Sequence, residues 1–520
     1  MPKRGGPTRH LELERKFAVP CDVSLDSPGA GVAPSFEGLA AVAGVEKLPT
    51  QSLDAVYFDT ADYALATRRV TLRRRTGGPD AGWHLKLPPA SGSGTPQART
   101  EVRAPLESGG AGAGASGPPE ELLDVVRAIV RDRPLVPVAR VATTRDVTVL
   151  RGPDGTALAE FCDDRVSAHT LEPGGDQIAA DEDRWREWEL ELTDVAVEDP
   201  AGLLDRLANR LADAGASPAA HGSKLARVLG AKVPPQTAPL ADPVHRAVAG
   251  QIERLLEWDR GVRADAEDSV HQMRVATRQI RSLLQASENA FGLTDDAWIL
   301  GELRELAAVL GVARDAEVLA ARYHEALQAL PANLVRGPVH DRLVGGARRR
   351  YEAGWRRSLS ALRSERYFRL LDALDALVVA SPPEPEGADS HPPATIASSY
   401  RRVRNATKAA KEAAETNRDD ALHRIRKAAK RLRYVAAATG DVEVSERSKV
   451  IQSLLGDHQD SVVSRVHLLQ QADAAHAAGE DTFTYGVLYQ QETDLARERR
   501  EQLDGALKTL RRSVRKSRRS

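Results

Sequence analysis

Carboxylates and cations alternate with apolar residues along short segments of the N-terminal half, and they are the first residues that could carry out chemistry. At residues 11–17 (LELERKF), the period of a β-strand places Glu12, Glu14 and Lys16 on one face and Leu11, Leu13 and Phe17 on the other. Residues 187–192 (EWELEL) likewise present three carboxylates opposite apolar side chains. Carboxylate oxygens at this spacing suit a divalent metal ion.

Cations follow the same pattern on other segments. Arg73 and Arg75 share a face at residues 71–75, Lys86 lies opposite an apolar face at residues 83–87, and Arg99 shares a face with Glu101. A strand of like charges repels itself unless opposite charge lies across from it. A barrel with these faces turned inward would satisfy both signs, and its interior would suit a metal-bound phosphate chain. The alternative is an open sheet with one solvated face.

These segments, taken in order, resemble the CYTH, or triphosphate tunnel metalloenzyme, family. The matching pieces are Glu12-x-Glu14-x-Lys16, the YFDT segment at 57–60, Leu72-Arg73-x-Arg75, Trp83-x-Leu85-Lys86, Arg99-x-Glu101, Glu189-x-Glu191 and Ser223-Lys224. The resemblance covers about residues 8–230 and implies an eight-stranded antiparallel β tunnel. Family members include inorganic triphosphatases, thiamine triphosphatases and class IV adenylate cyclases.

The resemblance also implies roles for individual residues, with Mg²⁺ or Mn²⁺ as the cofactor. The expected catalytic residues are Glu12, Glu14 and Lys16. The expected metal ligands are Glu12, Glu14, Glu160, Asp164, Glu189 and Glu191. The expected phosphate ligands are Lys16, Arg73, Arg75, Lys86, Arg99, Arg145 and Lys224, with Arg140 as a further candidate. One position departs from the family pattern, because Arg69 stands where relatives often have glycine.

The C-terminal half contains an internal repeat of a basic helix. The pattern H-x-x-R-x-x-x-[R/K]-x-x-R occurs at residues 271–281 and again at 423–433. In a helix these offsets fall within an arc of roughly 80°, so each copy predicts a stripe of one histidine and three cations. Each copy is followed by Leu-Gly-x-x-x-Asp, ending at Asp315 and Asp460. Like charges along a stripe are unfavourable unless an anion or facing acids relieve them; a solvated basic face is the alternative.

This half resembles the CHAD domain (conserved histidine α-helical domain) over about residues 241–515, which implies a helical bundle that binds inorganic polyphosphate. The duplication predicts two bundles related by a pseudo-twofold axis, with their stripes facing each other. The expected polyphosphate ligands are His271, Arg274, Arg278, Arg281, Arg314, His423, Arg426, Lys427, Lys430 and Arg433.

Composition and texture predict a multidomain α+β protein. The 520 residues carry 73 basic and 74 acidic side chains; 28 and 34 of these lie in residues 1–240. In chain order we expect a disordered N-terminus at 1–8, a CYTH-like tunnel domain with flanking helices at 9–231 and a linker at 232–243. An all-α CHAD-like domain follows at 244–510, with repeats at about 244–379 and 394–510, and a disordered basic tail at 511–520.

The chain has two cysteines, which excludes a disulfide framework, and it has no apolar run long enough for a membrane span. Both observations favour a cytoplasmic protein. The expected polyphosphate binding would allow it to associate with polyphosphate granules. The leading hypothesis is a metal-dependent triphosphatase whose helical domain binds polyphosphate. A non-catalytic polyphosphate-binding protein, a thiamine triphosphatase and an adenylate cyclase are the alternatives. Nucleic acid is a poor candidate partner, because aromatic residues make up 4% and none interleave with the basic stripes. Protein partners are not indicated.

Overall fold

The computed structural model describes residues 8–19, 33–89, 98–106, 117–172, 178–193, 199–234, 243–286, 291, 297–379, 395–414 and 417–517. Two compact units are present: Met1–Ala308 with Ser358–Pro382, and Val309–Arg357 with Pro383–Ser520. The units divide the helical half, so they do not coincide with the predicted domains. Most of the predicted linker and the N-terminal residues 1–7 lie outside the described residues.

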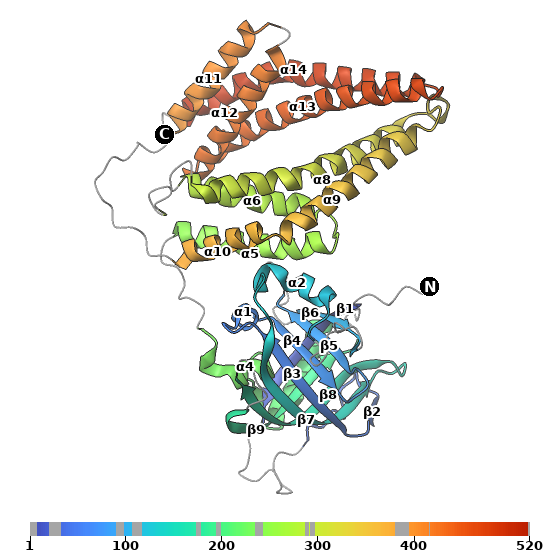
Figure 1. The fold of residues 1–520 in the computed structure, drawn as a ribbon, viewed down its shortest axis with the longest axis vertical. Helices are drawn as coiled ribbons and strands as arrows, with labels where there is room; N and C mark the ends of the chain where they lie inside the picture. The colour runs from blue at the N-terminus through green and yellow to red at the C-terminus, as the bar shows by residue number, and fades with distance from the viewer. Residues whose placement is uncertain are drawn as a thin grey trace, which may run out of the picture. The chain divides into compact units, whose positions relative to one another are not determined.

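Eight antiparallel strands close into a barrel in the order β1-β6-β5-β4-β3-β7-β8-β9, with β9 pairing back onto β1 (Figure 1). The strands are β1 (Thr8–Ala18), β3 (Gln51–Asp59), β4 (Thr71–Thr76), β5 (Gly82–Leu87), β6 (Ala98–Ala104), β7 (Val136–Arg151), β8 (Ala157–Leu171) and β9 (Ile178–Leu192). Two short strands, β2 (Gly44–Lys47) and β10 (Ser217–Pro218), pair with β7 and β1. The predicted eight-stranded antiparallel tunnel is confirmed.

Apolar clusters lie on both faces of the barrel wall. On the outer face, Leu13, Phe17 and Leu190 pack in one cluster with Leu204 and Leu207 of α3 (Pro200–Asp213), and a second cluster joins β4, β5 and β6 to α2 (Glu120–Val130). Because side chains alternate along a strand, this packing turns the charged faces of these strands inward. A third cluster joins β3, β7 and β8 to α4 (Lys224–Leu229). Its members Val141, Val166 and Trp185 share the faces of their strands with Arg145, Asp164 and Glu189, so this cluster lies on the inner face beside the charged lining.

Short helices complete the tunnel half, and long helices make up the rest of the chain. The short elements are α1 (Ala64–Thr67) and the 3₁₀ turn Gly230–Lys232. In the C-terminal half the α-helices are α5 (Pro243–Arg263), α6 (Ser269–Ala286), α8 (Trp298–Ala329), α9 (Gly346–Leu362), α10 (Glu365–Val379), α11 (Ile396–Glu412), α12 (Arg418–Ala438), α13 (Val442–Ala477) and α14 (Phe483–Ser517), with a 3₁₀ turn at Ala332–Leu334 and a π-helical turn at Asp341–Gly345. The predicted helical C-terminal half is confirmed, whereas its pseudo-twofold symmetry stays a prediction.

The second unit has two apolar cores. One lies among α11, α12, α13 and α14, with Ile425, Leu432 and Leu455 at its centre. The other joins α8 to α13 and α14 through Tyr323, Leu468 and Tyr485. Within the described residues, no helix is long and apolar enough to cross a membrane.

The basic tail differs from its prediction of disorder. Arg511 to Ser517 continue α14 as helix, because Ser513 and Val514 are buried and Val514 belongs to the core among α11–α14. Lys516 Nζ also lies 3.2 Å from Glu443 Oε2 of α13. The charged composition of the tail concealed these anchoring residues.

Candidate active site

The inner wall of the barrel is lined by side chains, most of them charged, from seven of its strands, from the β4–β5 turn and from the start of α4. The lining residues are Glu12, Glu14, Lys16, Tyr57, Thr71, Arg73, Arg75, Asp80, Lys86, Arg99, Glu101, Arg103, Arg145, Glu189, Glu191, Ser223 and Lys224. The expected phosphate ligands all lie in this one tunnel, together with four of the six expected metal ligands.

Strand register sets which charges meet inside the tunnel. Glu14 lies across from Glu191, and Lys16 across from Glu189, in the β1–β9 pair. The Lys16 ammonium contacts Glu189 and lies 3.2 Å from Glu14 Oε2. The cross-strand pairs that the sequence could only suggest are therefore formed by closure of the barrel.

Lys86 bridges the first two glutamates. Its Nζ lies 2.6 Å from Glu12 Oε2 and 3.8 Å from Glu14 Oε2. Burial raises the pKa of Glu12 to about 7; Lys86 opposes this shift, and Glu101 and Glu191 add to it. Burial would also raise the pKa of Glu14, but Lys16 and Lys86 outweigh it and lower the pKa to about 2. Burial therefore outweighs the neighbouring cation at Glu12, whereas the cations outweigh burial at Glu14.

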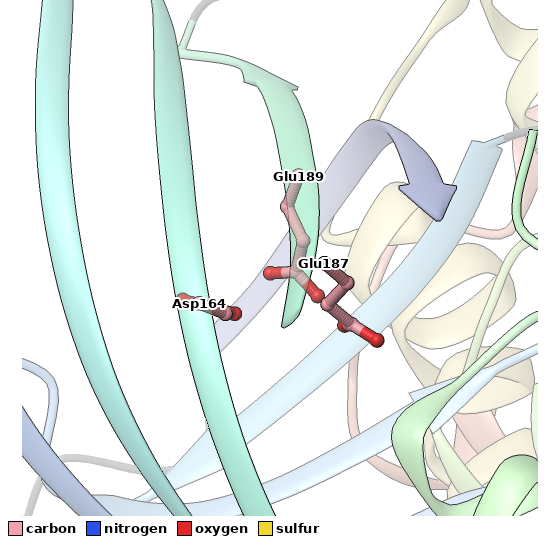
Figure 2. A group of neighbouring side chains, drawn as sticks. All are labelled: Asp164, Glu187 and Glu189. Carbon is pink, nitrogen blue, oxygen red and sulfur yellow. The ribbon is translucent and has the colours of Figure 1, made fainter. Parts of the chain in front are cut away.

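Three buried carboxylates converge on Lys224. Oxygens of Asp164, Glu187 and Glu189 lie within 4.8 Å of one another, and Figure 2 shows the side chains on β8 and β9. Lys224 Nζ lies 2.8, 2.6 and 2.7 Å from these three residues in turn. Ser223 places the lysine, because its Oγ caps α4 by accepting a hydrogen bond from the backbone N–H of Ala226 (3.1 Å).

Arg145 completes this group from β7. Its Nε and Nη2 donate to Asp164 at 2.7 and 2.6 Å, and Nη2 also contacts Glu189. Burial would lower the pKa of Arg145, but Glu189 and Asp164 raise it well above its ordinary value. Arg145 and Lys224 are thus held charged inside the wall.

Arg140, the further candidate on the same strand, lies outside the tunnel. It is 54% exposed and its guanidinium donates to both carboxylate oxygens of Asp54, at 2.9 and 2.7 Å. Strand alternation explains the difference, since positions five residues apart point to opposite faces. The expectation that Arg140 is a phosphate ligand is wrong.

The tunnel also has a strongly cationic region. Arg73 lies 3.5 Å from the Tyr57 hydroxyl, and the Nε atoms of Arg73 and Arg75 are buried without a hydrogen-bond partner among the described residues. Burial and the neighbouring Arg73 lower the pKa of Arg75 to about 9. Buried donors of this kind suit the oxygens of a phosphate chain.

The carboxylates fit a divalent metal ion by their chemistry and spacing. The oxygens of Asp164, Glu187 and Glu189 converge within 4.8 Å of one another, and such oxygens are the ligands that Mg²⁺ prefers. Glu12, Glu14 and Glu191 form a second candidate set, because all three line the tunnel and Glu14 lies across from Glu191 in the β1–β9 pair. Hard oxygen ligands suit Mg²⁺ or Mn²⁺.

Sequence reasoning placed most of these residues and missed some. Glu187 was not assigned as a metal ligand although its alternation with Glu189 gave the signal. Glu101 shares a face with Arg99 in the sequence pattern but was given no role, and neither was Arg103. Glu160, an expected metal ligand, shares the face of β8 with Asp164 and lies across from Glu191 in the strand register, and its role stays a prediction.

The repeated basic stripes lie on α6 and α12. On α6, Arg274 donates through Nε to the Ala307 carbonyl (3.3 Å), Arg278 is exposed, and Arg281 has a buried Nε without a partner among the described residues. On α12 the stripe residues His423, Arg426, Lys430 and Arg433 are half-buried, and Lys427 beside them is exposed. Burial lowers the pKa of His423, and Lys427 and Arg426 lower it further.

The second Leu-Gly-x-x-x-Asp motif lies against its stripe. A Cβ at Gly456 would lie 3.3 Å from Arg426 Nη2, so the glycine lets that guanidinium approach α13 closely. Arg314, the remaining expected polyphosphate ligand, lies on α8 with Nη1 2.8 Å from Glu317 Oε2. The stripe positions are therefore helical as predicted, and their polyphosphate role stays a prediction.

Comparison with known proteins agrees with this architecture. The CYTH domain family matches residues 10–218 and the CHAD domain family matches residues 246–469. Two uncharacterized proteins of Mycobacterium tuberculosis, MT2285 (strain CDC 1551 / Oshkosh) and Rv2226 (strain ATCC 25618 / H37Rv), are each 61% identical over 524 residues, covering 98% of both chains. The solved structure of PptA from Streptomyces chartreusis is 19% identical, with a TM-score of 0.43 over 52% of this chain and 100% of that one. The chain belongs to the family of proteins in which an N-terminal CYTH domain is followed by a CHAD domain.

Proposed function

We propose that the tunnel is a metal-dependent triphosphatase that hydrolyses inorganic triphosphate or a related triphosphate. CYTH domains are triphosphatases or cyclases, which places the activity on phosphates. The observation that supports the narrower proposal is the set of ion pairs inside the tunnel, which a metal-bound phosphate chain could replace. Glu189, for example, contacts Lys16, Arg145 and Lys224. The phosphate oxygens could bind such cations while the metal binds the carboxylates.

The reaction would proceed by attack of water on a terminal phosphorus. The P–O bond to the next phosphate breaks, and tripolyphosphate yields orthophosphate and pyrophosphate. Arg73, Arg75 and Arg145 would hold the non-bridging oxygens, and Lys16 and Lys86 would balance charge close to the glutamates. A divalent metal held by Glu12, Glu14 and Glu191 would neutralise the charge that builds up on the phosphate oxygens.

Nothing in the tunnel lining favours recognition of a base. Tyr57 is the one aromatic side chain among the lining residues of the described chain, and it is engaged by Arg73. This supports hydrolysis of inorganic triphosphate over adenylate cyclisation.

The helical half would bind inorganic polyphosphate through the stripes on α6 and α12. Arg278, Arg281 and Arg433 form no ion pair with a carboxylate in the described part of the chain, whereas Arg426 opposes the rise that burial gives to the pKa of Asp460. Cations left without facing acids favour binding of a polyanion.

The test is phosphate release from tripolyphosphate by the full chain with Mg²⁺, with Mn²⁺ and with EDTA. We expect metal-dependent release in the wild type and a loss of at least about 100-fold in Glu14→Gln, which keeps the side-chain volume but removes the charge. Arg140→Gln, on the outer face, is the matched control and should retain activity. Metal-independent release, or none while tripolyphosphate still binds, would contradict the proposal.

A further inference from the structure

A buried histidine in the tunnel wall has no part in the proposed reaction. His84 is 1% exposed and lies on β5 between Trp83 and Leu85. Its cross-strand neighbours are Arg73 on β4 and Arg103 on β6, which places it on the inner face. A histidine between two arginines needs a specific reason to be there, because both neighbours disfavour a charged ring.

Both ring nitrogens of His84 are within hydrogen-bond distance of an oxygen. Nε2 lies 2.9 Å from the Asp80 carbonyl oxygen, and Nδ1 lies 2.9 Å from Glu101 Oε1. A carbonyl oxygen can only accept, so Nε2 must carry a hydrogen. An unprotonated Nδ1 facing an ionised carboxylate would bring two lone pairs together, so one proton must lie between Nδ1 and Oε1. The ring therefore makes two directed hydrogen bonds.

The bond through Nδ1 fixes a carboxylate of the tunnel. The other oxygen of Glu101 accepts from Arg103 Nε, and Arg103 Nη2 reaches Glu12 Oε1 at 3.4 Å. Both oxygens of Glu101 are therefore held at the wall. Lys86 lies directly across from Glu101 in the strand register, so a released Glu101 could turn toward that lysine and compete with phosphate for it.

The bond through Nε2 fixes the turn that carries Asp80. The Asp80 carboxylate contacts Arg75, and Arg75 Nη2 also lies 3.4 Å from the Asp80 carbonyl oxygen. Gly82 lets the turn approach closely, because a Cβ there would lie 2.9 Å from the Ala104 carbonyl oxygen and 3.9 Å from His84 Nε2. One ring thus links the surroundings of Arg75 to those of Glu101.

We infer that His84 is a positioning residue of the tunnel, which holds Glu101 away from Lys86 and holds the β4–β5 turn around Arg75. The inference rests on the proposed triphosphatase function, because Lys86 and Arg75 are its phosphate ligands. Loss of the ring's hydrogen bonds should weaken phosphate binding more than it slows turnover. A residue needed only for folding would instead reduce the amount of active enzyme and leave KM unchanged.

The test is a set of substitutions that separate volume from hydrogen bonding. His84→Phe keeps an aromatic ring and removes both bonds, and it should raise KM for tripolyphosphate about tenfold with kcat changed less than about threefold. His84→Asn can donate near the Nδ1 position and His84→Gln near the Nε2 position, so each should recover part of the KM. His169→Phe, on the outer face of β8, is the control and should behave as wild type.

An unchanged KM in folded His84→Phe, or a lower thermal midpoint with no change in KM in any of the three variants, would overturn the inference. If His84→Phe does not fold, the Asn and Gln variants give the same readout. Absence of turnover in the wild type would count against the proposed function alone, and the dissociation constant of tripolyphosphate would then replace KM.

A spectroscopic measurement reads the ring without reference to activity. With ¹⁵N-labelled histidine, we expect the His84 signals, assigned by their loss in His84→Asn, to show a protonated Nε2 and an Nδ1 shift that changes in Glu101→Gln. An unprotonated Nε2, or an Nδ1 shift insensitive to Glu101→Gln, would overturn the inference.

Discussion

The tunnel and the basic helices α6 and α12 both gather positive charge, but they balance it differently. In the tunnel, Lys16, Lys86, Arg145 and Lys224 each contact buried carboxylates. On the helices, the described residues provide no carboxylate partner for stripe cations such as Arg278 and Arg433. Buried, balanced charge suits a short substrate that brings its own metal, whereas half-exposed cations suit a long anion bound by many weak contacts.

The largest expected effect separates the inside of the tunnel from its outside on one strand. Arg145→Gln should reduce tripolyphosphate hydrolysis at least about 100-fold, because it removes a buried donor and leaves Asp164 and Glu189 with one cation fewer. Arg140→Gln removes the same charge from the outer face of β7 and should change activity less than about twofold. Steady-state kinetics on both variants checks this, and equal losses would remove the distinction between the two faces.

The second expected effect separates the tunnel from the helices. Arg274→Glu with Arg426→Glu should weaken binding of long-chain polyphosphate by about 10- to 100-fold and leave tripolyphosphate hydrolysis intact. Glu14→Ala should do the reverse. Arg431→Glu, an exposed position on α12 outside the stripe, is the matched control.

Salt should sharpen the same distinction. Polyphosphate affinity should fall steeply with ionic strength, whereas KM for tripolyphosphate should rise less steeply because its sites are buried. Binding isotherms and kinetics at several salt concentrations measure this. If the double variant and Glu14→Ala each lost both polyphosphate binding and tripolyphosphate hydrolysis, the assignment of these two functions to separate parts of the chain would be wrong.

A smaller effect concerns the pH dependence of stability, which should differ between His467 in the helical half and Glu14 in the tunnel. Burial, together with Arg350, which contacts Nε2, lowers the pKa of His467 on α13 to about 4. A histidine with a lowered pKa stabilises the fold above its unfolded pKa of about 6.5, and this contribution is lost as pH falls toward 4. We expect a loss of up to about 3 kcal/mol across that window.

Urea unfolding of the wild type and of His467→Gln at pH 7.0, 5.5 and 4.5 measures this contribution. The variant should show a flatter pH dependence. The lowered pKa of Glu14 in the tunnel acts at lower pH, since its stabilisation is present above about 4.5 and is lost toward 2. Parallel pH profiles for wild type and variant would show that His467 does not titrate on unfolding.

The tunnel could be predicted from the sequence because its signal has a period of two. Alternation at Glu12, Glu14 and Lys16, and at Glu189 and Glu191, states which side chains share a face, and closure then brings those faces together. Alternation does not predict the role of a residue whose partners lie on other strands or on a helix. Glu187 and Glu101 were visible as members of a charged face, but their contacts with Lys224 and His84 depend on α4 and on the register between β5 and β6.

In the helical half, the sequence predicted the helices but not where the last one ends. The period of the stripes predicted helices correctly, since a helix sets its own geometry. The end of α14 was misjudged, because its composition is dominated by arginine and its anchoring residues are only Ser513 and Val514. Local charge outweighed the weak apolar signal in that prediction.

The smallest predicted effect concerns Arg69, which stands where relatives often have glycine. Arg69 adopts φ of 57°, in the left-handed region, and its N–H donates to the Ala66 carbonyl oxygen at 2.9 Å. A backbone conformation that favours glycine is therefore adopted here by an arginine, at a cost of about 1 kcal/mol. Arg69→Gly should relieve this strain and raise the free energy of unfolding by up to about 1 kcal/mol, reduced by the greater chain entropy of glycine when unfolded. Chemical denaturation measures the change, with Arg69→Ala as the control that keeps a Cβ and should give no gain. A gain in Arg69→Ala equal to that in Arg69→Gly would mean that charge, and not backbone conformation, limits stability at this turn.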